Sequence, residues 1–307
     1  MSLEPDHLLD RQHLTRSLTL WRVAAVFALI ALLATLSGGG EKIRKGKSVA
    51  RLTVEGILVE DLEREAALAD LADDPDTVAL IVHINSPGGT VVGGESLYHA
   101  IRTAAGRLPV AVVMGEVAAS AGYMVALAGD RIFARQGSIT GSIGVIWQTA
   151  DITGLLTKLG ITTEAIKSGP LKAVPSPLEP VTPEVRKATR DLVLDIYDLF
   201  VDMVSDRRHL SRSKVEQLAD GRVFTGRQAL KVRLIDEIGG EDAARMWLFH
   251  MHDVDSSLPI LELKTDARDK FWRSLVSIMA EKTFFPERVT LDGLISLWHP
   301  EGAEGIQ

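Results

Sequence analysis

Ser120 follows a strongly apolar run and precedes a predicted helix, and a serine at such a turn can act as a covalent nucleophile. The apolar run is Val110–Met114, and the sequence continues as Gly-Glu-Val-Ala-Ala-Ser-Ala-Gly-Tyr. This pattern predicts a strand that turns into a helix at the serine. Alone, a serine here is more typical of a helix N-cap, and the full G-x-S-x-G motif is absent. The hypothesis of a nucleophile therefore depends on the rest of the chain.

A glycine pair, Gly88 and Gly89, follows a second apolar run, Val78–Ile84, in the sequence Asn-Ser-Pro-Gly-Gly. Ligands bind at the carboxyl ends of the strands in open α/β sheets, where this pair and Ser120 are both expected. Paired glycines let the backbone approach a substrate, and their amides can point at a developing oxyanion. The amide of Ala121, directly after the serine, is the candidate second donor. The pair alone is also compatible with a simple turn, but its combination with Ser120 favours a hydrolase.

A nucleophilic serine needs a general base, and no histidine lies between His99 and His209. His83 falls inside a predicted buried strand, so we interpret it as a core histidine. We expect His99 on an exposed helix face. Sequence distance does not exclude a Ser-His-Asp triad, but none of these histidines lies in a loop near either strand end.

Lysine is the alternative base, as in Ser-Lys variants of the catalytic triad. A lysine must be desolvated to accept a proton near neutral pH. Lys172 ends the segment Lys-Ser-Gly-Pro-Leu-Lys, and its small and apolar neighbours could provide that desolvation. Lys167 is the competitor, but it ends a strand-like run, Ile161–Ile166, and is predicted to be exposed. Lys172 is therefore the preferred candidate.

Apolar runs alternate with helical periodicity from Ser48 onward, which predicts an α/β fold with a mainly parallel sheet and helices on both faces. The predicted strands are Val49–Leu58, Val78–Ile84, Val110–Met114, Arg131–Ala134 and Ile143–Trp147. The predicted helices are Asp61–Leu71, Gly94–Ala105, Asp151–Leu159, Glu184–Arg208 and Lys214–Leu218.

The segment Val23–Gly40 has 18 residues without a charge, enough for roughly 27 Å of helix. We predict a transmembrane signal anchor at 18–40, after a tail at 1–17 and before a linker at 41–47. A cleaved signal peptide and a buried helix are the alternatives, and flanking charges do not settle the orientation. The main domain is predicted at 48–256.

Residues 257–307 are predicted to form a C-terminal extension. Its mixture of apolar and charged residues is interpreted as a packed surface helix, with membrane contact or a subunit interface as alternatives. Across the chain, the formal net charge of −7 argues against a nucleic-acid partner, and the absence of cysteine excludes disulfides, thiolate catalysis and cysteine metal sites. We expect neither a metal nor a cofactor.

Five sequence blocks together resemble the short form of the signal peptide peptidase A family, serine peptidases of bacterial envelopes. They are I-N-S-P-G-G (84–89), A-S-A-G-Y (119–123), T-G-S-I-G-V (140–145), K-S-G-P-L-K (167–172) and G-R-V-F-T-G-R-Q-A (221–229). The resemblance covers roughly residues 18–245. The first block alone is shared with the caseinolytic protease ClpP and crotonase-like enzymes, and the fourth and fifth blocks select this family.

The resemblance implies a Ser-Lys dyad, with Ser120 as nucleophile and Lys172 as general base. It also implies an oxyanion hole from the Gly89 and Ala121 amides, with Gly88 adjacent, and a Ser142 hydroxyl that orients the lysine. A departure is Arg233, at a position where a glycine is usual.

The same resemblance implies a homo-oligomer on the outer, periplasmic face of the bacterial inner membrane, with Lys172 supplied to Ser120 of a neighbouring subunit. The two side chains then need not meet within one protomer. The implied substrates are signal peptides and similar apolar peptides. Two other functions stay open: a crotonase-type acyl-CoA enzyme and a catalytically silent scaffold in a membrane complex.

Overall fold

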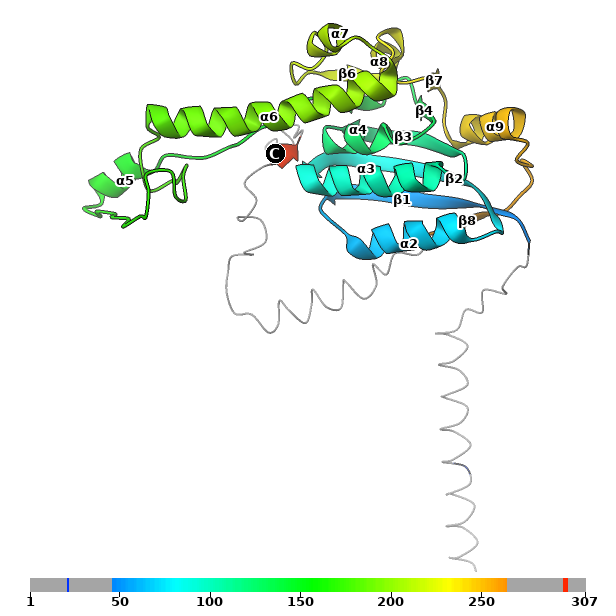
Figure 1. Cartoon of the computed structure of the whole chain (residues 1–307), viewed down its shortest axis with the longest axis horizontal. Coiled ribbons are helices and arrows are strands. Elements are labelled where there is room, and N and C mark those ends of the chain that lie inside the picture. The colour runs from blue at the N-terminus through cyan, green and yellow to red at the C-terminus, as the bar shows by residue number, and fades with distance from the viewer. Residues whose placement is uncertain (1–20, 22–45, 264–294, 298–307) are drawn as a thin grey trace, which may run out of the picture. The chain divides into compact units, whose positions relative to one another are not determined.

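A mainly parallel β-sheet is the centre of the fold (Figure 1). The computed structural model describes Trp21, residues 46–263 and residues 295–297. The strands follow the spatial order β6-β5-β3-β2-β1-β8. Their bounds are β1 Ser48–Leu58, β2 Thr77–Thr90, β3 Val110–Ala119, β5 Ile139–Gly141, β6 Val223–Thr225 and β8 Ile260–Glu262. Outside this path, β4 (Arg131–Ala134) pairs with β3 and with β7 (Glu237–Ile238), and β9 (Ile295–Leu297) pairs with β2.

The two long central strands are apolar on both faces, as expected for strands of a covered parallel sheet. In β2, Leu80 and Val82 belong to one buried cluster, while Ala79 and Ile81 belong to a second cluster on the opposite face. All four side chains are fully buried. This double burial explains why the strand has a continuous apolar run instead of an alternating pattern.

Helices cover both faces of the sheet. One cluster includes residues of α2 (Leu62–Asp73), α3 (Val91–Ala105) and α4 (Ala121–Ala126), and the opposite cluster includes residues of α9 (Glu241–His252). The predicted α/β class, the parallel order of the central strands and the two helical layers are therefore confirmed.

The long helix α6 (Pro183–Arg208) crosses above α3 and α4 and continues beyond the sheet (Figure 1). The Thr182 side chain accepts a hydrogen bond from the Val185 N–H, as an N-cap residue does. Near the other end, Phe200 and Val204 are buried in the core. Arg207 donates to the carbonyls of Leu127 and Gly129, at 2.8 and 2.9 Å, and so ties this end of α6 to the chain after α4.

An arm, which we define as residues 151–182, lies at the far end of α6 and contains the short helix α5 (Thr153–Lys158) (Figure 1). Between α5 and α6, the arm has turns and bends but no further helix or strand. Two other short helices, α7 (Arg212–Glu216) and α8 (Gly226–Lys231), follow α6 on either side of β6 in the sequence.

One predicted strand is wrong. Residues Ile143–Trp147 do not form a strand, and the strand in this part of the chain is β5, which ends at Gly141. Gly141 and Ser142 both have positive φ, 83° and 50°, so the chain turns out of the extended conformation there. The chemistry of the side chains at 143–147 gave no indication of this turn.

The predicted anchor at 18–40 lies outside the described residues except for Trp21. Among the helices that are described, none has the length and apolar character needed to cross a membrane. The predicted extension at 257–307 contributes two strands to the sheet, since β8 pairs with β1 and β9 pairs with β2. Its other residues, 264–294 and 298–307, are outside the described part of the chain.

Candidate active site

Ser120 lies at the turn between β3 and α4 and has a backbone conformation that residues other than glycine rarely adopt. Its φ is 54° and its ψ is −121°. The turn is fixed from the neighbouring strand, because the Ser120 N–H donates to the Gly141 carbonyl at 2.8 Å. The Ser120 side chain makes no capping hydrogen bond to α4, which argues against a simple N-cap. The G-x-S-x-G sequence is absent, but the backbone has the sharp strand-to-helix turn that presents nucleophilic serines in other hydrolases.

The two glycines near the end of β2 are required by the backbone geometry. Gly88 has a φ of 122°, a backbone conformation that would be strained for any residue with a side chain. A Cβ atom on Gly89 would lie 1.9 Å from the Leu58 carbonyl oxygen, so β1 leaves no room for a side chain. The Gly88 N–H donates to Ser86 Oγ at 3.2 Å, and this hydroxyl also donates to the Gly56 carbonyl at 2.6 Å. Since the Gly88 amide is engaged within the turn, Gly89 is the better candidate of the two for an oxyanion donor.

β3 leaves one edge of β2 uncovered next to the glycine pair. The last pair between β2 and β3 is Ser86 with Ala118. Beyond it, β3 turns into Ser120, and residues Gly88–Thr90 pair instead with β9 in antiparallel orientation. Gly89 is opposite Ser296 in this register. An extended segment is therefore accommodated beside the glycine pair.

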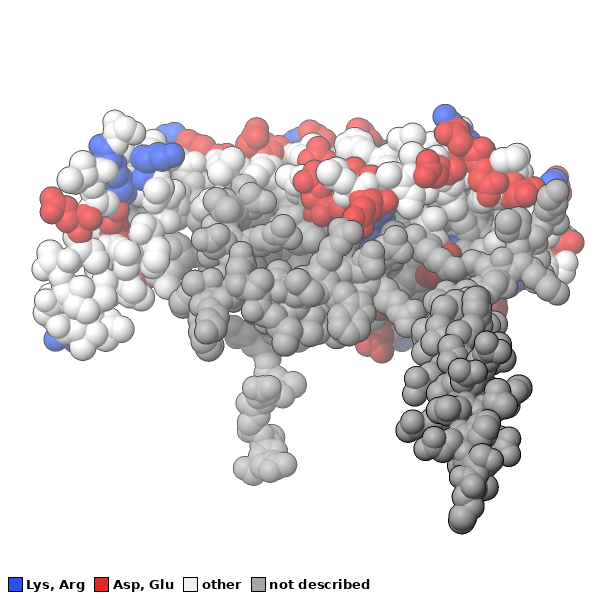
Figure 2. All heavy atoms as spheres, turned by 90° about the horizontal axis from the view of Figure 1, so that it is seen from below, with Lys and Arg blue, Asp and Glu red and all other residues white. Residues whose placement is uncertain are grey.

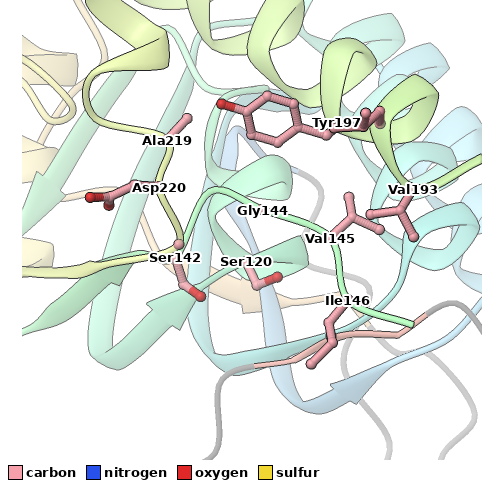
Figure 3. A pocket seen from close by; sticks show the side chains of 11 residues that line it. Ser120, Ser142, Gly144, Val145, Ile146, Val193, Tyr197, Ala219 and Asp220 are labelled. Carbon is pink, nitrogen blue, oxygen red and sulfur yellow. The ribbon is translucent and has the colours of Figure 1, made fainter. Parts of the chain in front are cut away.

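Ser120 and Ser142 line one cavity of about 550 Å³ (Figure 3). Val145 and Ile146 follow Ser142 along the wall, and α6 provides another wall. The lining residues are Ser120, Ser142, Gly144, Val145, Ile146, Val193, Leu194, Tyr197, Ala219, Asp220 and Gly221. Burial raises the pKa of the Tyr197 hydroxyl, and the nearby Glu216 and Asp198 carboxylates raise it further, so this hydroxyl stays neutral at physiological pH. The α6 wall of the cavity is therefore uncharged, whereas Asp220 adds a carboxylate to the lining.

The predicted site residues fall into two groups. Ser120, Ala121 and Ser142 come together around the turn, because the Ser120 N–H donates to the carbonyl of Gly141, the residue directly before Ser142. Lys172 is exposed and is not among the residues that line the cavity. The expectation that its own chain desolvates Lys172 is wrong for a single protomer.

The competing lysine is in a different environment from the one predicted. Lys167 is only 16% exposed at its side chain, and its Nζ lies 2.6 Å from Glu179 Oε2. The prediction of an exposed Lys167 is wrong because this ion pair and the surrounding turns cover it. Its engagement with a carboxylate makes it a poor candidate for a free base.

Neither histidine discussed above lines the cavity. His83 is partly exposed and not a fully buried core residue, whereas His99 is exposed as predicted and pairs with Glu95. In the part of the chain that the structure describes, no group of three or more His, Cys, Asp or Glu side chains could hold a metal ion.

The α6 residues Val193, Leu194 and Tyr197 and the loop residue Asp220 had not been predicted for the site. The amphipathic pattern of the helix gave no sign that one stretch of it borders a cavity. Gly221 begins one of the five blocks of the resemblance, which is the one signal that points to this loop.

The family model for peptidase family S49 matches residues 103–255. A protein named as a putative protease in Synechocystis sp. is 37% identical over 211 residues, which cover 68% of this chain and 76% of that protein. This chain belongs to peptidase family S49. A protein named as a putative signal peptide peptidase SppA in Enterococcus faecium is 33% identical over 218 residues, which cover 66% of this chain and 63% of that protein.

Another relative has the reaction type in its name. The chloroplastic serine protease SPPA of Arabidopsis thaliana is 33% identical over 215 residues, covering 67% of this chain and 32% of that protein. As a member of family S49, this chain is a serine-type protease. Among solved structures, a point mutant of ClpP1 from Listeria monocytogenes aligns with 62% of this chain and 91% of its own, at a TM-score of 0.41 and 16% identity.

Proposed function

We propose that this S49 peptidase is a membrane-anchored serine endopeptidase that hydrolyses signal peptides and similar apolar peptides with a Ser-Lys dyad. The observation that carries the proposal is the strained turn at Ser120, which lines a cavity directly after the strand that pairs with β2. Strained backbone at a cavity is typical of catalytic residues. The strain here is maintained by the hydrogen bond from Ser120 to β5.

In the proposed reaction, Ser120 Oγ attacks the carbonyl carbon of the scissile peptide bond while Lys172 Nζ accepts the hydroxyl proton. The Gly89 and Ala121 amides stabilise the negative charge that develops on the carbonyl oxygen. Lys172 then returns the proton to the leaving amine, and an acyl-enzyme forms on Ser120. A water molecule, deprotonated by the same lysine, hydrolyses this ester and restores the serine.

The pairing of β9 supports an extended peptide as the substrate. Peptides commonly bind by adding a strand to an exposed sheet edge, where the main chain provides the hydrogen bonds. Residues Gly88–Thr90 already accept a strand in this way. A substrate strand in the place of β9 would run past Gly89, and its carbonyl groups would lie near the proposed oxyanion donors.

The arm supports a shared site in a homo-oligomer. Its apolar side chains are exposed, with Leu159 at 64% and Ile166 at 97%, and Figure 2 shows uncharged atoms between groups of charged ones at this end of the molecule. Patches of this kind mark contacts between proteins. We propose that a second copy covers the arm, that this contact desolvates Lys172, and that Lys172 serves Ser120 of that copy, with the Ser142 hydroxyl as its hydrogen-bond partner.

The proposed location is the bacterial inner membrane, with the peptidase domain on the periplasmic side. It rests on the uncharged segment Val23–Gly40, which is long enough for one span. An apolar substrate left in the bilayer after secretion would then lie close to the catalytic domain.

The test uses the full chain in detergent with a fluorogenic peptide of apolar residues. Ser120→Ala and Lys172→Ala should each abolish hydrolysis while the oligomer and the melting temperature are retained. Ser213→Ala, which changes an exposed serine on α7, should leave the rate unchanged and is the matched control. Hydrolysis at the wild-type rate by Ser120→Ala would refute the mechanism.

A further inference from the structure

The loop that carries Lys172 has almost no regular structure of its own. Residues 168–178 contain turns and bends but no helix or strand. One local hydrogen bond, from the Lys172 N–H to the Gly169 carbonyl at 3.2 Å, forms a turn just before the lysine. The Lys172 side chain makes no hydrogen bond or ion pair within the described residues. Its position must therefore be set by the two ends of the loop.

The two ends are joined by an ion pair. Lys167 Nζ and Glu179 Oε2 are 2.6 Å apart, and these side chains are 16% and 35% exposed. An ion pair that is partly shielded from water is screened less than one on an open surface. It closes a loop of 13 residues, from 167 to 179, around Lys172. Closing a loop reduces the range of positions that its central residues sample.

Two further contacts continue this connection into the arm. Thr163 Oγ1 donates to the Leu178 carbonyl at 3.0 Å, and the Ile152 N–H donates to the Pro177 carbonyl at 3.0 Å. Pro177 and Leu178 are the two residues before Glu179. The end of the loop near Glu179 is thus hydrogen-bonded to residues before and after α5. The ion pair connects the other end, at Lys167, to Glu179.

The same ion pair connects the loop to α6. Glu179 lies three residues before Thr182, the N-cap of α6. Further along this helix, Val193 and Tyr197 line the cavity that contains Ser120. A displacement of Glu179 relative to Lys167 would shift Lys172 relative to α6, the long helix of its own protomer, and so change the position from which Lys172 reaches the second copy.

We propose that Lys167 and Glu179 are positioning residues, whose ion pair sets the place of Lys172 for proton transfer. This rests on the proposed role of Lys172 as the base. It also assigns different tasks to the two lysines of the segment: Lys167, neutralised by Glu179, is the anchor of the loop, and Lys172 is left available for chemistry. A misplacement of about 1 Å at a reacting group can cost roughly 100-fold in rate.

The experiment measures kcat and KM for an apolar peptide with full-length variants. Glu179→Ala should lower kcat roughly 10- to 100-fold, because the base is misplaced, and should change KM less than about twofold. Lys167→Ala should have the same effect, and the double variant should lose no more than either single variant, because both remove one interaction. The exchanged pair, Lys167→Glu with Glu179→Lys, should recover most of the lost kcat.

A second ion pair gives the matched control. Lys187 and Asp191 on α6 have the same 2.6 Å separation, but they are 78% and 59% exposed and close no loop. Asp191→Ala should therefore leave kcat within about twofold of wild type, as expected for an exposed pair. Equal kcat in Glu179→Ala and wild type, or no recovery in the exchanged pair, would overturn the proposal.

Hydrogen exchange of residues 168–178 gives a readout that does not depend on activity. Glu179→Ala should accelerate exchange in this loop, and the exchanged pair should restore the slower rate. If Lys172→Ala retains hydrolysis, the proposed dyad fails irrespective of Glu179. If Lys172→Ala is inactive but Glu179→Ala has wild-type kcat and exchange, the positioning role fails alone.

Discussion

The two halves of the proposed site lie in regions of opposite character. The turn at Ser120 is buried, with the serine 1% exposed, and its backbone N–H is held by the Gly141 carbonyl of β5. The arm with Lys172 projects beyond the sheet and exposes apolar side chains (Figure 1). The proposed nucleophile is thus prepared within a single chain, whereas the described residues of that chain do not supply the environment that a lysine base needs. The comparison suggests that assembly, and not folding alone, completes this peptidase.

The largest difference in stability is expected between two alanine substitutions, one of a glycine at the sheet edge and one of a glycine in the arm. Gly89→Ala should destabilise the fold by about 4 kcal/mol and abolish activity, because the new Cβ atom meets the β1 backbone. Gly169→Ala should change stability little, since no atom lies within 4 Å of the added carbon. Thermal unfolding of the two variants measures the difference. Equal melting temperatures would contradict the contrast between a rigid edge and an open arm.

A smaller effect is expected from a charge on the exposed face of the arm. Ile166→Asp should leave the folded protomer intact but weaken self-association, with a roughly tenfold loss of activity, because burying a carboxylate in the contact is costly. Sedimentation and peptide hydrolysis measure both quantities. Met251→Asp, on α9 and 68% exposed, is the control and should change neither. If the Ile166→Asp variant formed an oligomer as stable as that of the wild type, the arm would not be part of the interface.

The smallest effect is expected from loss of β9 pairing at the sheet edge. Proline lacks an amide hydrogen and is poorly accommodated within a sheet. Ser296→Pro should weaken the pairing with Gly89 and lower the KM for a peptide about two- to threefold, since the peptide then competes less with β9. Ser296→Ala keeps the amide and should retain the wild-type KM. An increase in KM on the proline substitution would indicate that β9 helps to build the peptide site.

The central sheet was predictable because buried parallel strands leave a simple signal. The run Val78–Ile84 is apolar throughout apart from His83, since both of its faces are covered. The strand continues to Thr90 through Pro87 and the two glycines, where composition indicates a turn. The extension depends on pairing with β1 and β9, which are distant in the sequence. Local propensity contains no information about such partners.

The part of the site around Ser120 was predictable because its residues follow predicted strands directly in the sequence. Ser120 could be recognised from the strand before it and the glycine pair, and its strained backbone is consistent with that hypothesis. The exposure of Lys172 could not be read from its small and apolar neighbours, because the arm lacks a surface against which to pack in one chain. Leu192 is a comparable case: it is an apolar residue of α6 but is 43% exposed.

The most direct test of the shared site is complementation between two inactive variants. Ser120→Ala contributes an intact Lys172, and Lys172→Ala contributes an intact Ser120. The two variants are dissociated, mixed and reassembled, and hydrolysis of the apolar peptide is measured against each variant alone. Our account predicts that the mixture regains activity while each variant alone stays inactive. A mixture as inactive as its components, with mixed oligomers demonstrated, would contradict the sharing of Lys172 between copies.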